Sequence, residues 1–169
     1  MQSAIGYNNA AREYRVYTSK EFTLTGNNYV PVFRITGNVL VKKLYAVVTT
    51  VLETSHGHSQ FLLNDQTARY NITAPHDTSY TNLPVGSTME KMALAAVIVN
   101  VSSSATGIFE ELVYSNVSYY QEFKVTMKST ESHTDIEYFY NTPDDPAKGV
   151  MQFFCVYVPF SADAAVEAL

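Results

Sequence analysis

The chain has 169 residues, the usual size of one domain, and 46% of them are hydrophobic, which is enough to bury a core. Charged residues make up only 16%, and the net charge of −5 comes without any cluster of Lys and Arg, which argues against nucleic acid as a partner. No apolar run reaches the ~20 residues of a membrane span, and the N-terminus has no apolar core of signal-peptide length, so we expect a soluble protein that is made in the cytoplasm and binds no membrane.

Aromatic residues are plentiful: the chain has thirteen Tyr and nine Phe but no Trp. Tyr carries an apolar ring and a polar hydroxyl, which suits half-buried sheet faces and interfaces. A surface with little charge is also easier for a partner to cover, so the composition favours a subunit of an assembly. The single cysteine, Cys155, lies in the apolar run FFCVYVPF and is predicted to be a buried thiol.

Residues 1–13 are mostly small and polar and show neither helical nor strand periodicity. We predict an N-terminal arm that is loose or is ordered only by a partner; a simple frayed terminus is the alternative. Tyr7, Tyr14 and Tyr17 would be the adhesive side chains of this region, and Arg12 lies where the arm ends.

The first half of the chain predicts short strands separated by turns in which Gly and Asn tolerate positive φ. Strands are expected at residues 14–18, 22–25, 30–35, 39–52, 60–63 and 68–73, with turns at 26–28 and 36–38. The strand at 39–52 is rich in β-branched residues and is largely apolar on both faces. We therefore place it at the centre of the fold, buried on both sides, or buried on one side and at a subunit contact on the other.

The second half begins with a long excursion over residues 74–88, followed by an ambiguous stretch at 89–101. MEKMALAA favours a helix and VIVNV favours a strand; we predict a strand at 92–101 that a helical turn can precede. Further strands are expected at 108–114, 116–128, 134–140 and 150–160, and residues 161–169 form a short tail that can hold one helical turn. In the strand at 116–128, Phe123, Val125 and Met127 share the face predicted to be buried, opposite Lys124.

About ten strands, no convincing amphipathic helix and no linker indicate an all-β fold. The most economical architecture is a single antiparallel β-sandwich or barrel of the jelly-roll kind. It divides the chain into an N-terminal arm (1–13), a β-sandwich domain (14–160) and a C-terminal tail (161–169).

A group of histidines and carboxylates is the one candidate for metal binding. His56 and His58 lie two residues apart and could chelate an ion together with Asp65, His76 and Asp77. No ligand pair at an established spacing accompanies them, so we interpret them as surface-loop residues and expect neither a metal nor another cofactor.

Two pairs of adjacent carboxylates, Glu110–Glu111 and Asp144–Asp145, are candidates for acid–base chemistry. Neighbouring residues on a strand point to opposite faces, so Glu110 and Glu111 cannot act together. The chain also lacks the GxSxG, P-loop and GxGxxG motifs. We therefore expect no catalytic residues and no enzyme.

The run FTLTGNNYVPVFRITGNVLVKKLYAVVTTVLE, together with the closing strand FFCVYVPF, resembles small structural proteins of tailed-bacteriophage heads. The matching parts are residues 32–53 and 151–160, about a fifth of the chain. The resemblance implies an all-β decoration (cement) or auxiliary capsid protein on the capsid surface of the virion, made in the host cytoplasm. It further implies a homo-oligomer, with a trimer favoured, whose partners are the major capsid protein or other virion proteins, and it carries no catalytic residues.

Other functions remain open beside this resemblance. One is a single jelly-roll subunit of the capsid shell, and another is a tail or fibre component. A third, from a different class, is a carbohydrate-binding β-sandwich module that would stack sugars on Tyr114, Tyr119 and Tyr120. The residues predicted to make contacts with partners are Tyr7, Arg12, Tyr14, Tyr17, Tyr119 and Tyr120.

Overall fold

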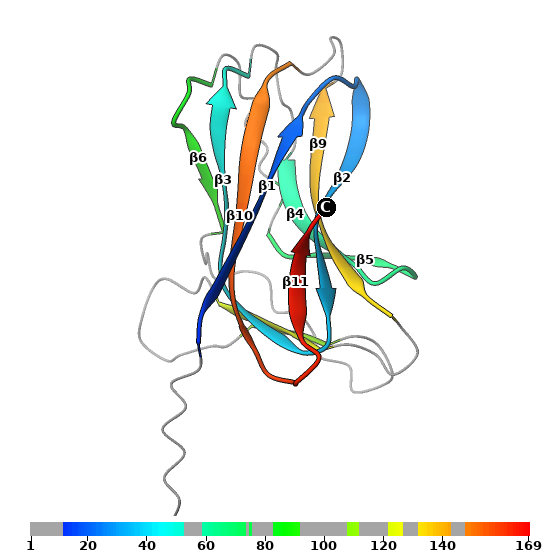
Figure 1. The fold of residues 1–169 in the computed structure, drawn as a ribbon. Helices are drawn as coiled ribbons and strands as arrows, with labels where there is room; N and C mark the ends of the chain where they lie inside the picture. Colours follow the sequence, from blue (N-terminus) through cyan, green and yellow to red (C-terminus); the bar gives the residue numbers. More distant parts are fainter. Residues whose placement is uncertain are drawn as a thin grey trace, which may run out of the picture.

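The computed structural model describes residues 12–52, 59–73, 75, 83–91, 108–111, 122–126, 132–142 and 148–169 (Figure 1). In these residues it contains eleven strands and no helix, which confirms the all-β class. The strands are β1 (Tyr14–Glu21), β2 (Gly26–Thr36), β3 (Val39–Thr50), β4 (Ser59–Asn64), β5 (Arg69–Asn71), β6 (Thr88–Glu90), β7 (Ile108–Glu111), β8 (Phe123–Thr126), β9 (Thr134–Thr142), β10 (Val150–Pro159) and β11 (Ala165–Ala168).

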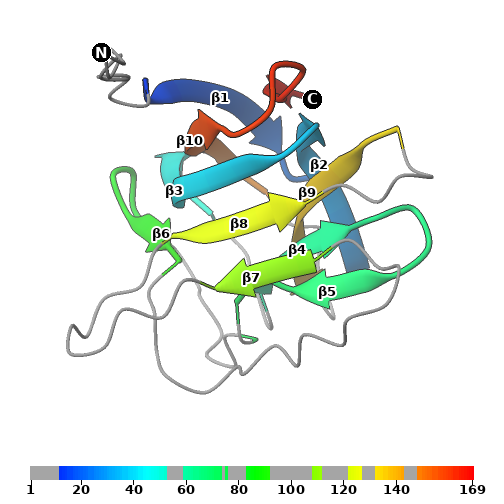
Figure 2. The same cartoon turned by 90° about the horizontal axis from the view of Figure 1, so that it is seen from below.

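The strands form two antiparallel sheets, as a β-sandwich requires. The six-stranded sheet has the order β1-β10-β3-β8-β7, with β6 also paired to β3, and the five-stranded sheet has the order β11-β2-β9-β4-β5. Strands that follow one another in the chain often lie in different sheets. Within the six-stranded sheet, β10 lies between β1 and β3 (Figures 1 and 2). The strand predicted to be central, β3, pairs with β10, β8 and β6.

The core lies between the inner faces of the two sheets and is rich in aromatic rings. Phe22, Phe61, Tyr138 and Phe153 are all less than 4% exposed, and their rings contact one another at centroid distances of 5.2–6.5 Å. Cys155 is fully buried beside them in the same core, which confirms the predicted buried thiol. Burial raises the pKa of this thiol because the thiolate would lose its hydration.

The alternation predicted around Phe123 is confirmed on β8. Phe123 and Val125 are buried in the core, whereas Glu122, Lys124 and Thr126 are half-exposed. Met127 lies outside the described residues.

β3 contains a β-bulge, an extra residue that changes which side chains point into the core. Lys43 pairs with Val156 of β10 and Val41 pairs with Tyr157, so Lys42 is the extra residue between them. The bulge lets both Val41 and Leu44 point into the core, although their spacing of three residues does not fit a regular strand. Lys42 forms an ion pair with Glu122, next to β8.

The predicted strand at 22–25 is wrong. Here the chain crosses from the six-stranded to the five-stranded sheet, and Phe22 fills the space between them with 1% exposure. The predicted turn at 26–28 is also wrong, because β2 already begins at Gly26. The turn predicted at 36–38 is confirmed: Gly37 has φ 64°, and a Cβ there would lie 2.7 Å from Ser161 Oγ.

The C-terminal segment is a strand, so the helical turn expected in it is wrong. β11 pairs with β2, and Val166 is buried in the core. Leu169 N–H donates to Val32 O at 3.1 Å, and Thr18 Oγ1 donates to Leu169 O at 2.8 Å. The last residues therefore join the edge of one sheet to the edge of the other.

Three predictions remain, for the stretch before residue 92, for residues 92–101 and for the N-terminal arm. The helical turn expected before residue 92 is wrong, because residues 88–90 form β6. The strand predicted at 92–101 and the N-terminal arm up to residue 11 lie outside the described residues.

Candidate contact surfaces

Three aromatic side chains line up across the outer face of the six-stranded sheet. Tyr17 of β1 lies opposite Phe154 of β10, which in turn lies opposite Tyr45 of β3. The ring centroids of Tyr17 and Phe154 are 6.0 Å apart, and those of Phe154 and Tyr45 are 4.8 Å apart with nearly parallel planes. Tyr17 is 60% exposed, and the other two are half-buried. We call these three residues the aromatic row.

Aliphatic side chains lie further along the same face, but they are buried. Leu40, Val156 and Val158 are at most 9% exposed, yet they do not belong to the core cluster. Val158 lies opposite Leu40, and Val156 lies two residues from Phe154, on the same face of β10. β3 is therefore buried on its inner face and apolar on much of its outer face, as its sequence predicts.

Two cations lie beside the aromatic row. Arg15 of β1 and Lys43 of β3 are both opposite Val156, one on each side, and both are exposed. Neither forms an ion pair with any described carboxylate, in contrast to Lys42, which contacts Glu122.

Of the residues predicted to make contacts, the structure brings Arg12 and Tyr14 together and places Tyr17 on the opposite face of β1. Tyr17 is part of the aromatic row. Tyr14 is 41% exposed, stacks on Tyr157 at 5.6 Å and lies under the Arg12 guanidinium, also at 5.6 Å. The other predicted residues, and one tyrosine of the carbohydrate hypothesis, lie outside the described part of the chain: Tyr7, Tyr114, Tyr119 and Tyr120.

Tyr45 and Phe154 were not among the residues predicted from the sequence to make contacts. The signal was present in the alternation of FFCVYVPF, where the cysteine predicted to be buried places Phe153 on the core side and Phe154 on the other. That alternation indicates that Phe154 points outward, but not which residues of distant strands lie beside it.

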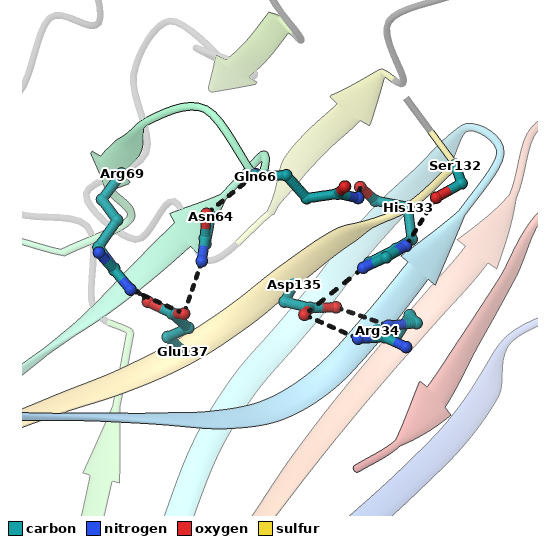
Figure 3. Close-up of polar contacts among 8 residues, drawn as sticks. All are labelled: Arg34, Asn64, Gln66, Arg69, Ser132, His133, Asp135 and Glu137. Atoms are coloured by element: carbon teal, nitrogen blue, oxygen red, sulfur yellow. Dashed lines mark hydrogen bonds and ion pairs between the residues drawn. The ribbon is translucent and has the colours of Figure 1, made fainter. Parts of the chain in front are cut away.

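The outer face of the five-stranded sheet carries paired charges instead (Figure 3). Arg34 donates to both carboxylate oxygens of Asp135, at 2.9 and 3.1 Å. Arg69 Nε donates to Glu137 Oε2 at 2.6 Å, and Asn64 Nδ2 donates to Glu137 Oε1 at 2.7 Å. We call these five residues the charge network.

Hydrogen bonding within the charge network stabilises its charged forms. The hydrogen bond to Asp135 raises the pKa of Arg34, and the hydrogen bond to Glu137 raises the pKa of Arg69. The Glu137 side chain is only 4% exposed, so its carboxylate depends on these donors in place of water. The Arg69 guanidinium also lies 4.2 Å from the centre of the Tyr29 ring, a cation–π contact.

Next to this network, Ser132, His133 and Asp135 have the residue types of a hydrolytic triad. The Ser132 Oγ to His133 Nδ1 distance is 2.9 Å, but His133 Nε2 lies 3.9 Å from Asp135 Oδ2. That second distance is too long for a hydrogen bond, and Arg34 already occupies both oxygens of Asp135. The geometry is that of a surface ion-pair group.

Asp65, the one described residue of the candidate metal site, stabilises a tight turn between β4 and β5. Its Oδ1 accepts hydrogen bonds from Thr67 N–H, Thr67 Oγ1 and Ala68 N–H at 2.7–2.9 Å. Such a local cap is typical of Asp in a turn. The part of the chain that the structure describes contains no group of three His, Cys, Asp or Glu side chains placed to hold a metal ion. The other four candidates lie outside it: His56, His58, His76 and Asp77.

Comparison with known proteins identifies no relative. No protein-family model, no curated protein and no solved structure matches this chain. Within the residues described here, no helix is both long enough and apolar enough to span a membrane.

Proposed function

We propose that the protein is a virion structural protein of the decoration (cement) or auxiliary head type, which stabilises an assembled shell by protein–protein contacts. The observation that carries this proposal is the apolar outer face of the six-stranded sheet, where Tyr17 is 60% exposed in line with Phe154 and Tyr45. Where one face of a sheet points to water, its side chains are usually polar. An aromatic row on that face is therefore typical of a contact surface. The partner in this proposal is the major capsid protein or another virion protein.

The strand order supports the finer proposal that the sandwich is a jelly roll. When β6, β7 and β11 are set aside, the sheets reduce to β1-β10-β3-β8 and β2-β9-β4-β5. Two four-stranded antiparallel sheets with repeated crossings between them are the arrangement of an eight-stranded jelly roll. The same order favours the second candidate function, a single jelly-roll subunit of the shell itself.

Oligomerisation and the N-terminal arm belong to the same proposal. In it the protein acts as a homo-oligomer, with a trimer favoured, and residues 1–13 form an arm that binds a neighbour. Fixing such a segment costs ~1–2 kcal/mol per residue in backbone entropy, which a strand added to a neighbour's sheet edge would offset through main-chain hydrogen bonds.

The test is binding to shells of the source virus that lack this protein. Bound protein is measured by co-sedimentation, shell stability by calorimetry, and the mass of the free protein by light scattering. We expect binding and a higher melting temperature of the shell. If the full-length protein binds no shell, the decoration proposal fails; if it instead builds closed shells alone, the shell-subunit function replaces it.

A truncated protein tests the arm separately. Deleting residues 2–12 touches no residue of β1, so the protein should stay folded. We expect weaker binding to shells. Unchanged binding would exclude the arm and leave the rigid surface as the contact.

A further inference from the structure

We infer that the aromatic row and its two flanking cations form a docking site for an acidic segment of a shell protein, in which carboxylates stand next to apolar side chains. The inference rests on the proposed function, because it names the chemistry of the partner on the shell. It concerns one face of the molecule, defined by Arg15, Tyr17, Lys43, Tyr45 and Phe154.

The geometry places the charged and aromatic groups in two adjacent rows across the sheet. Arg15, Val156 and Lys43 form one row over β1, β10 and β3, and the aromatic row follows two residues further along each strand. Neighbouring strands lie ~4.8 Å apart, so the two cations stand about 10 Å from each other, with the rings about 7 Å to one side. A segment that lies across the three strands would meet cations along one edge and rings along the other.

Charge complementarity decides between possible occupants of this site. The chain carries a net charge of −5, yet the row of Val156 presents two exposed cations that form no ion pair with a described carboxylate, and two carboxylates of this face, Glu13 and Glu90, lie in the flanking rows. A second copy whose row of Val156 stacked on this one would bring Arg15 and Lys43 against their own counterparts, and like charges at an interface are unfavourable. A partner with carboxylates beside apolar groups satisfies both rows at once.

The experiment combines charge reversal with two probes. The variant Arg15→Glu/Lys43→Glu is compared with wild type in binding to shells that lack the protein. A matched control is Lys148→Glu, which reverses an exposed charge outside this face. We expect the double variant to bind roughly tenfold more weakly or worse, and the control to bind like wild type. Both should melt at the temperature of wild type, since all three side chains are exposed.

A second probe makes the site testable without shells. Poly-L-glutamate is titrated into the protein while backbone amide signals are followed by NMR, with poly-L-lysine as the control polymer. We expect shifts confined to β1, β10 and β3, which weaken as salt rises from about 0.05 to 0.5 M and vanish in the double variant.

The outcomes separate the inference from the function. If wild type binds shells and the double variant binds equally well, this docking site is refuted while the decoration function stands. If wild type binds no shell but poly-L-glutamate shifts these three strands, the decoration function fails and the acidic-segment site stands. If poly-L-glutamate shifts other regions or none, and shell binding ignores the charge reversal, the site is refuted.

Discussion

The two outer faces of this sandwich differ in whether their charged side chains are paired within the chain. On the five-stranded sheet, Arg34 and Arg69 each bind a carboxylate of β9 at 2.6–3.1 Å. On the six-stranded sheet, aromatic rings stay partly exposed, and Arg15 and Lys43 form no ion pair with a described carboxylate. The first face pairs its charged groups within the chain, whereas the second leaves both aromatic area and two cations exposed.

The two faces therefore differ in the free energy that would be gained if another molecule covered them. A bidentate pair gains little in solution from a further partner, because its charges are already neutralised. An exposed ring gains ~25 cal/mol for each Å² that a partner covers. The five-stranded sheet also exposes a ring, Tyr29 at 46%, but that ring already lies under the Arg69 guanidinium. The following predictions test this difference between the two faces.

The largest effect separates the core from the outer face on one strand. Phe153→Ala should reduce the free energy of unfolding by ~3–5 kcal/mol, because the ring is fully buried between the sheets. Phe154→Ala, one residue further on, should cost about 1 kcal/mol, since its ring packs only against Tyr17 and Tyr45 on the outer face. Chemical denaturation measures both. Equal losses would mean that the aromatic row is part of the core.

An intermediate effect is expected from the charge network. Arg69→Met should cost about 1.5–3 kcal/mol, because it removes a charge-assisted hydrogen bond from the nearly buried Glu137 carboxylate. The double variant Arg69→Met/Glu137→Leu should recover most of this loss, since no buried charge remains unpaired. Thermal unfolding of both variants and of Glu137→Leu alone completes the cycle. A double variant as unstable as Arg69→Met would show that packing of the arginine, rather than pairing, matters.

The smallest effect is expected at the most exposed member of the aromatic row. Tyr17→Ser should change the free energy of unfolding by no more than ~0.5 kcal/mol, because the side chain is 60% exposed. The measurement is again denaturant unfolding, with Ser19→Ala on the same face of β1 as a control. A loss above about 2 kcal/mol would assign Tyr17 a structural function.

Sequence patterns predicted the elements whose own residues decide their structure. The long strand at β3 and the alternation around Phe123 follow from local side-chain periodicity, and both are confirmed. The C-terminal segment was missed because Ala and Glu favour a helix, whereas pairing with β2, which starts almost 140 residues earlier, makes it a strand. Non-local pairing overrode local preference there.

The candidate surfaces were predictable only in part for the same reason. Tyr17 could be selected from its position near the N-terminus, but its neighbours come from strands that the sequence does not align. Arg34 and Asp135 are 101 positions apart in the chain, and no local pattern relates them. The register between distant strands creates both surfaces, and it is a property of the folded sheets.

The rate at which the buried thiol of Cys155 reacts with a thiol reagent can report on opening of the fold. Cys155 lies opposite Val16 of β1 and Leu44 of β3, in the middle strand of the three that carry the aromatic row. The thiolate is the reactive species, and burial both hides this sulfur and raises its pKa, so a thiol reagent can modify it only when the core between the two sheets opens. Because the chain has no other cysteine, the rate of labelling measures the opening of this core, and any ligand that binds only the folded sandwich should slow that rate.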